Sequence, residues 1–168
     1  MVVAGKGANN LGMQCGGWSI EWQGGQGDIT VGTTILDGIK KTVSESTEII
    51  YSEDGSDVVP NPDNIAVVVI GEDPYTEWFR DKENLDLNND DIELIKSLKD
   101  KGFKVAVLLI SGRPLNVADH IDQWDAFAAI WLPGTEGDGV SDVLFGDFGS
   151  TGRSVSYTHL TLPTTYHV

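Results

Sequence analysis

Acidic and aromatic residues follow directly after a hydrophobic run in the middle of the chain. Residues 65–71 are apolar, few in number and rich in β-branched side chains, which is typical of a strand buried on both faces of a sheet. Glu72 follows this run at once, and Tyr75, Glu77 and Trp78 come soon after it. A carboxyl group among aromatic rings is suited to proton transfer or to binding a polyhydroxylated ligand. Glu72 is therefore the first candidate for a functional residue.

Purely structural roles for these acids stay open from composition alone. A carboxylate at the end of a strand can cap a neighbouring helix, and Glu72 could also pair with Arg80. Glu77 and Asp81 are better explained as solvated or hydrogen-bonded acids of a loop.

The glycine-rich segment 12–27 contains Trp18 and Trp22 and follows the first expected strand. A glycine-rich turn in this place can bind phosphate, but no G-x-G-x-x-G opens a helix here, and the Lys-Ser/Thr pair of a P-loop is missing. Tryptophans on such a loop better suit a sugar, whose C–H faces stack on aromatic rings. Alternatively, the two tryptophans only anchor a long loop.

Two further loops are expected at the carboxyl ends of strands. Ser111 is no nucleophile of the G-x-S-x-G kind, because Leu109 and Arg113 stand where the glycines belong, and spacing gives no reason to bring His120 to it. Arg113 is expected to tie its own loop together. Thr135 is expected to cap the helix that follows the last strand.

Apolar runs alternate with segments of helical period, which predicts an α/β fold with a parallel sheet and right-handed crossovers. The expected strands are residues 2–5, 48–51, 65–71, 104–112 and 126–132, and the expected helices are 33–43, 90–101 and 139–145. Asn89 or Asp90 is expected to cap the second of these helices, and Gly102 fits the position just after its end. Ligands of open α/β sheets lie beyond the carboxyl ends of the strands, which is where Glu72 falls.

Length and charge exclude several classes of partner. The 168 residues suit one domain, and a net charge of −15 argues against nucleic acid or an anionic membrane as a partner. No apolar stretch approaches the roughly 20 residues that span a bilayer. Cys15 is the single cysteine, so no disulfide can form within the chain. The histidines (His120, His159 and His167) are scattered, so we expect neither a metal nor another cofactor.

Six ordered motifs resemble glycoside hydrolase family 3. They are residues 15–24 (CGGWSIEWQG), 32–36 (GTTIL), 71–77 (GEDPYTE), 109–115 (LISGRPL), 131–137 (WLPGTEG) and 142–148 (DVLFGDF). The resemblance covers residues 2–152 and points to the second domain of that family, a three-layer α/β sandwich with a mostly parallel sheet. The most similar members are β-glucosidases and exo-β-glucanases that act on 1,3- and 1,4-linked glucans.

The resemblance implies a retaining mechanism that is split between two domains. An Asp nucleophile would come from a preceding (β/α)8 barrel, and Glu72 would be the acid/base by its position in the motif. Trp18 would be one of two tryptophans that hold the sugar beyond the cleavage point, and Glu77 and Arg113 are further candidates for substrate binding. This chain alone is expected to be inactive, because retaining chemistry needs two carboxyl groups about 5–5.5 Å apart.

Both ends of the chain depart from the family pattern. No barrel precedes the first strand, so we expect an N-terminally truncated domain over residues 1–152 with exposed sheet surface at its start. Residues 153–168 are rich in threonine, lack acidic residues and resemble a translated sequencing adaptor, so we expect a tail without a native role. Close relatives are often periplasmic or secreted, but the segment that would decide the location is not in the chain.

Two other classes of protein stay open. A non-catalytic carbohydrate-binding module would use the Trp18 loop without proton transfer, and a barrel encoded in the same reading frame would argue against it. A flavodoxin-like nucleotide or flavin module would share the topology, although the missing phosphate loop argues against this class.

Overall fold

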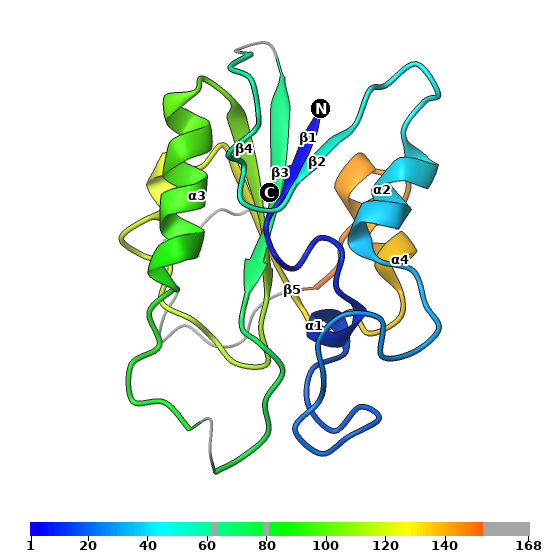
Figure 1. Ribbon diagram of the computed structural model, residues 1–168, viewed down its shortest axis with the longest axis vertical. Helices are drawn as coiled ribbons and strands as arrows, with labels where there is room; N and C mark the ends of the chain where they lie inside the picture. Colours follow the sequence, from blue (N-terminus) through cyan, green and yellow to red (C-terminus); the bar gives the residue numbers. More distant parts are fainter. Residues whose placement is uncertain (62–63, 79–80, 153–168) are drawn as a thin grey trace.

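Five strands form a single parallel sheet in the computed structural model, which describes residues 1–61, 64–78 and 81–152 (Figure 1). They are β1 (Val2–Ala4), β2 (Ile50–Ser52), β3 (Ile65–Gly71), β4 (Lys104–Ile110) and β5 (Ala126–Trp131), in the order β2-β1-β3-β4-β5. Every neighbouring pair is parallel. The order reverses between β1 and β3, and such a switch point opens a crevice at the carboxyl edge of the sheet.

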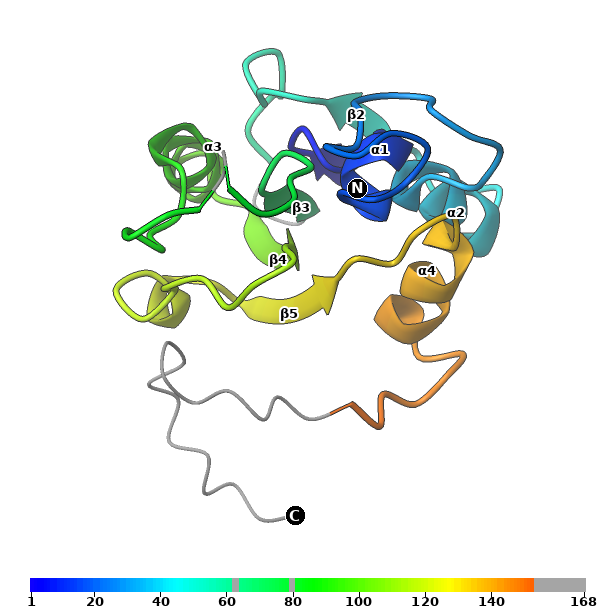
Figure 2. The same ribbon diagram turned by 90° about the horizontal axis from the view of Figure 1, so that it is seen from below.

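Helices cover both faces of the sheet, as the predicted three-layer α/β class requires (Figure 2). They are α1 (Leu11–Cys15), α2 (Ile35–Thr42), α3 (Asn89–Asp100), the 3-10 helix η1 (Ile121–Gln123) and α4 (Gly137–Phe145). The helix α3 lies on one face, whereas α2 and α4 lie together on the other. Within the described residues, no helix is long and apolar enough to cross a bilayer.

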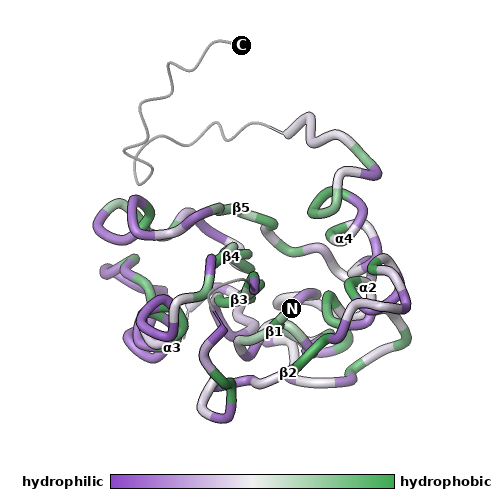
Figure 3. Tube along the Cα trace, turned by 90° about the horizontal axis from the view of Figure 1, so that it is seen from above, coloured by the Kyte–Doolittle hydropathy of each residue, from purple (hydrophilic) through white to green (hydrophobic). Residues whose placement is uncertain are grey.

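Alternating side chains of the strands fill two hydrophobic cores. Val68 and Ile70 of β3 pack with Leu98 of α3, whereas Val69 points to the other face and packs with Ile39 of α2. Figure 3 shows hydrophobic residues along β4 and β5. Successive side chains of β3 thus point to opposite faces of the sheet, and a hydrophobic core covers each face. For this reason the strand is almost entirely apolar.

Helix caps differ in part from the prediction. Asn88, not Asn89 or Asp90, caps α3, and its side chain accepts a hydrogen bond from the Asp90 N–H at 3.1 Å. Gly102 follows this helix with φ +90°, as predicted. The predicted cap Thr135 is wrong, because α4 begins at Gly137, one residue later than a Thr135 cap requires: Glu136 is the N-cap residue, and the Thr135 hydroxyl lies 2.9 Å from its carboxylate.

The exposed sheet surface is also not where the sequence predicted it. Val2 and Val3 of β1 are buried, because they belong to the two hydrophobic cores on opposite faces of the sheet. The exposed strand is β5 at the edge, where Ala126, Ala129 and Trp131 remain accessible. The short helices α1 and η1 lie outside the helical ranges that the sequence predicted.

Candidate active site at the carboxyl edge of the sheet

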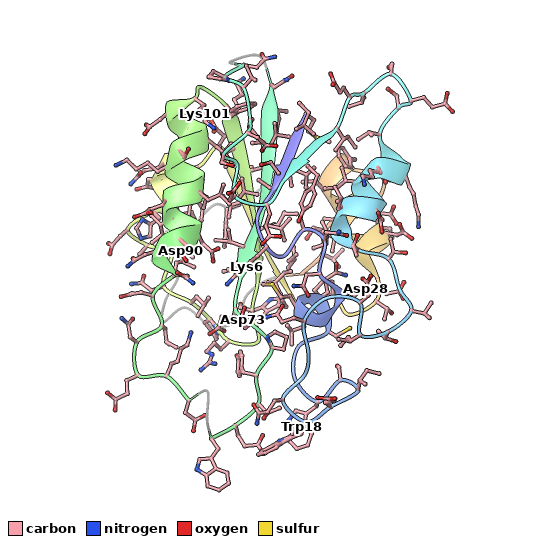
Figure 4. All side chains as sticks on the ribbon, in the orientation of Figure 1. Lys6, Trp18, Asp28, Asp73, Asp90 and Lys101 are labelled. Carbon is pink, nitrogen blue, oxygen red and sulfur yellow. The ribbon has the colours of Figure 1, made fainter. Side chains whose placement is uncertain are left out.

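The loops after β1, β3 and β4 meet at the carboxyl edge of the sheet, which faces downward in Figure 1. Lys6 and Asp73 lie close to this edge, and Trp18 lies farther out (Figure 4). The Lys6 Nζ atom is 3.6 Å from Asp73 Oδ1, so an ion pair joins the loops that leave the sheet on the two sides of the switch point.

Glu72 is the first residue after β3, and its carboxylate is buried between two cations. Its backbone N–H still donates to the Ile110 carbonyl of β4 at 3.1 Å. The side chain is 7% exposed. Arg113 Nε donates to Oε2 at 3.1 Å, and Lys82 Nζ donates to Oε1 at 3.3 Å. A buried carboxylate needs such partners, because burial removes its hydration. Arg80, the partner considered from sequence, lies outside the described residues.

Tyr75 fixes the position of Arg113. The Arg113 Cζ atom lies 3.8 Å from the centre of the Tyr75 ring, which is a close cation–π contact. Burial raises the pKa of Tyr75, and the negative charge of Glu72 raises it further, whereas Arg113 opposes the change. The Tyr75 hydroxyl therefore stays protonated at neutral pH and keeps a proton to donate. Arg113 does more than tie its own loop, because it links the end of β4 to the acid after β3.

Glu72 borders two cavities. The first, here called the acid cavity, has a volume of about 270 Å³ and is lined by charged residues that include Lys6, Asp86, Asp91, Lys82 and Arg113. Asp91 lies in the first turn of α3 and is 6% exposed. Burial raises the pKa of Asp91, and the positive charge of Lys6 partly opposes this change.

The second cavity, here called the tryptophan cavity, has a volume of about 310 Å³. Its lining includes Trp18, Glu72 and Glu77. Trp18 is 69% exposed and has φ +62°, a conformation that costs energy for a residue with a side chain. The centre of its indole ring lies 6.3 Å from that of Trp22. An exposed indole beside a buried carboxylate offers a stacking surface next to a proton donor or acceptor.

A buried amide holds the glycine-rich loop in place. The Gln14 side chain is fully buried, and its Nε2 donates to the carbonyls of Thr33 and Gly134 at 3.1 and 3.0 Å. Its Oε1 accepts a hydrogen bond from the Ile35 N–H at 3.0 Å. Gln14 thus connects α1 to the start of α2 and to the loop after β5, which fixes the base from which Trp18 projects.

The structure brings the predicted site residues together around one carboxylate. Glu72, Trp18 and Glu77 line the tryptophan cavity, and Arg113 lines the acid cavity. Sequence reasoning missed Lys82, because nothing in its spacing pointed back to Glu72. It also missed Asp91, since an acid in the first turn of a helix is favoured by the helix dipole without any further role.

The described residues provide no metal centre. No group of three or more His, Cys, Asp or Glu side chains among them could hold a metal ion. His159 and His167 lie outside the described part of the chain.

Residues 1–161 match the family model of the glycosyl hydrolase family 3 C-terminal domain. The chain therefore belongs to this family, as the motifs around Glu72 and Trp18 predicted.

Relatives in this family are similar over most of the chain. An exo-1,3/1,4-beta-glucanase from a Pseudoalteromonas species is 43% identical with a TM-score of 0.76, and the match covers 85% of this chain and 18% of that one. The lysosomal beta glucosidase of Dictyostelium discoideum is 28% identical over 99% of this chain and 22% of its own length. A beta-xylosidase of Formosa agariphila is 30% identical over 71% of this chain and 18% of its own. The chain thus spans about a fifth of the length of these glycoside hydrolases. Family and fold are confirmed.

Proposed function

We propose that this chain supplies the acid/base residue of a retaining, exo-acting β-glucosidase on β-1,3/1,4-glucans or cello-oligosaccharides. Glu72 is that residue, and the nucleophile is an Asp of a (β/α)8 barrel that is not part of these residues. The observation that carries the proposal is the placement of Glu72: a buried carboxylate at the switch point of the sheet, on the border of a cavity whose wall includes Trp18. Trp18 stacks on the sugar beyond the cleavage point.

The step assigned to Glu72 needs one of its oxygens to face the glycosidic oxygen. In the first half-reaction the carboxylic acid gives its proton to the departing oxygen, and in the second the carboxylate takes a proton from water. Both oxygens have a cation beside them here, so one contact has to open. Lys82 is the partner that moves, because it is 49% exposed, whereas Arg113 is 18% exposed and stacked on Tyr75.

The other two predicted residues support substrate binding in this proposal. Glu77 lies in the wall of the tryptophan cavity, where its carboxylate accepts hydrogen bonds from sugar hydroxyl groups. Arg113 keeps the Glu72 side chain in place and lines the adjoining acid cavity. A flavodoxin-like module shares this strand order but is not favoured by any feature of the site.

The proposal is tested in a fusion protein. In it, residues 1–152 replace the corresponding domain of the Pseudoalteromonas exo-glucanase, which supplies the barrel. The isolated chain should not hydrolyse aryl β-glucosides, whereas the fusion should. In the fusion, Glu72→Ala should lower turnover of substrates with poor leaving groups by about 100-fold or more, and turnover of activated aryl glucosides much less, because a good leaving group departs without a proton. Equal losses on both substrates would remove Glu72 from the acid role.

A further inference from the structure

Trp78 follows β3 in the chain and is strongly exposed, as Trp18 is. Its side chain is 74% exposed, and its φ of +80° is unusual for an aromatic residue. Within the described residues, the other non-glycine residues with positive φ are Trp18, Ile20 and Trp131, and all of them follow or end the strands at the carboxyl edge. Backbone strain of this kind gathers at sites that bind ligands.

Both backbone polar groups of Trp78 are hydrogen-bonded to Asp81. The Trp78 N–H donates to Asp81 Oδ1 at 3.2 Å, and the Asp81 N–H donates to the Trp78 carbonyl at 3.4 Å. Asp81 itself lines the tryptophan cavity together with Trp18 and Glu77. The unusual conformation of Trp78 is thus fixed from the rim of the cavity that Glu72 borders.

The segment that leads to Trp78 is in direct contact with the Trp18 loop. A Cβ atom added at Gly17 would lie 2.0 Å from the Tyr75 carbonyl oxygen, and one added at Gly24 would lie 2.7 Å from Pro74. The two loops therefore pack against each other at the carboxyl edge of the sheet. One carries the exposed indole of Trp18, and the other carries that of Trp78.

The charge of the tryptophan cavity limits what can bind beside these indoles. Four carboxylates line it (Glu72, Asp73, Glu77 and Asp81), and none of its lining residues, all of them in the described part of the chain, is Lys, Arg or His. Carboxylates accept hydrogen bonds from neutral sugar hydroxyl groups but repel the carboxylate or sulfate groups of acidic glycans.

We infer that Trp78 stacks on the second sugar unit beyond the cleavage point of a neutral β-glucan chain. This rests on the proposed function, in which Glu72 acts on the terminal bond and Trp18 holds the first sugar beyond it. Three consecutive sugars are then the shortest chain that reaches Trp78. Glu72 and Asp73 are each paired with nearby cations. Glu77 and Asp81 in the cavity wall therefore select neutral glucans over glycans that contain uronic acids.

The chain itself provides the test, through the indole N–H signals of its tryptophans in nuclear magnetic resonance. The Trp78 signal is identified as the one lost in Trp78→Phe, and the Trp18 signal likewise in Trp18→Phe. Cellotriose and laminaritriose should shift both signals, because this chain contacts the sugars beyond the cleavage point. A Trp18 response without a Trp78 response to the trisaccharides overturns the inference and leaves the role of Glu72 untouched. The absence of both responses overturns the inference as well.

A second test of the inference measures the binding affinity of variants. In the fusion, whose barrel holds the sugar before the cleavage point, Trp78→Ala should weaken binding of cellotriose roughly fivefold to tenfold, because one sugar–indole stack is lost, and should leave cellobiose binding unchanged. Phe148→Ala is the matched control, since Phe148 is an exposed aromatic residue after α4 and outside both cavities. Equal weakening for both sugars, or binding of trigalacturonic acid as tight as that of cellotriose, overturns the inference.

Discussion

The two oxygens of Glu72 have charged partners that are held very differently. Arg113 is largely buried and stacks on Tyr75, so little conformational entropy is lost when it pairs with Glu72. Lys82 is half exposed, and its Nζ atom lies 3.3 Å from Glu72 Oε1. Exposed ion pairs contribute little to stability, whereas the loss of one partner of a buried pair leaves an uncompensated charge. The two cations should therefore differ in their contribution to folding.

Substitution of each cation by alanine tests this difference. We expect Arg113→Ala to lower the free energy of unfolding of the chain by about 2 kcal/mol, because it leaves a buried carboxylate oxygen without its donor. We expect Lys82→Ala to cost less than about 1 kcal/mol. Urea denaturation of the two variants measures both values, and equal losses would contradict the arrangement described for Glu72.

The titration of Tyr75 reports on the charge of its neighbour. Its pKa is raised mainly by burial and further by the negative charge of Glu72. Glu72→Gln removes that charge, so the pKa of Tyr75 should fall. The tyrosinate absorbance, taken as the difference between each protein and its Tyr75→Phe form, measures this change. An unchanged or higher pKa in Glu72→Gln would contradict the contact.

Among the elements of the site, the Trp18 loop and the loop after β3 are in direct contact at Gly17. Any side chain at Gly17 would overlap the Tyr75 carbonyl. We expect Gly17→Ala to destabilise the chain by about 2 kcal/mol or more, since backbone atoms cannot yield as a flexible side chain can. Gly139→Ala is the matched control in α4. Nothing lies within 4 Å of the added methyl group there, so it should stabilise the helix by about 0.5–1 kcal/mol. Thermal unfolding distinguishes the two, and a neutral Gly17→Ala would mean that the loops are not in contact.

The elements were predictable from sequence to different degrees, for physical reasons. The strand β3 was predicted with its bounds as found, because seven consecutive apolar and mostly β-branched residues are typical of a strand in the interior of a parallel sheet. Glu72 was predictable because it follows this strand. The N-cap of α3 was misplaced by one or two residues because Asn88, Asn89 and Asp90 are all good caps. The contacts of Gln14 and Lys82 join distant segments, and no local pattern encodes such contacts.

At the scale of the whole molecule, the domain boundary remains a prediction. The family match extends to residue 161, whereas the sequence pattern places the last residue of the domain at 152. We expect deletion of residues 153–168 to leave the free energy of unfolding unchanged within about 0.5 kcal/mol, as for other surface changes. Denaturation of the full and shortened chains measures this. A clear loss of stability in the shortened chain would assign those residues to the fold.

The proposed reaction needs two carboxylates, and these residues are proposed to supply one of them. Glu72 can give and take a proton, but a retaining glycosidase also needs a second carboxylate on the opposite side of the sugar, which a barrel would supply. Once the covalent intermediate has formed, the role left for Glu72 is to activate water. A small anion that needs no such activation should replace water when Glu72 is absent.

The most direct measurement is therefore the product formed by the Glu72→Ala fusion in the presence of azide. With an activated aryl β-glucoside, we predict faster turnover on addition of azide and accumulation of β-glucosyl azide, because azide attacks the intermediate without a general base. Its β configuration reports two inversions at the anomeric carbon. Glucose as the sole product, or turnover that azide does not change, would contradict the assignment of Glu72 as the acid/base.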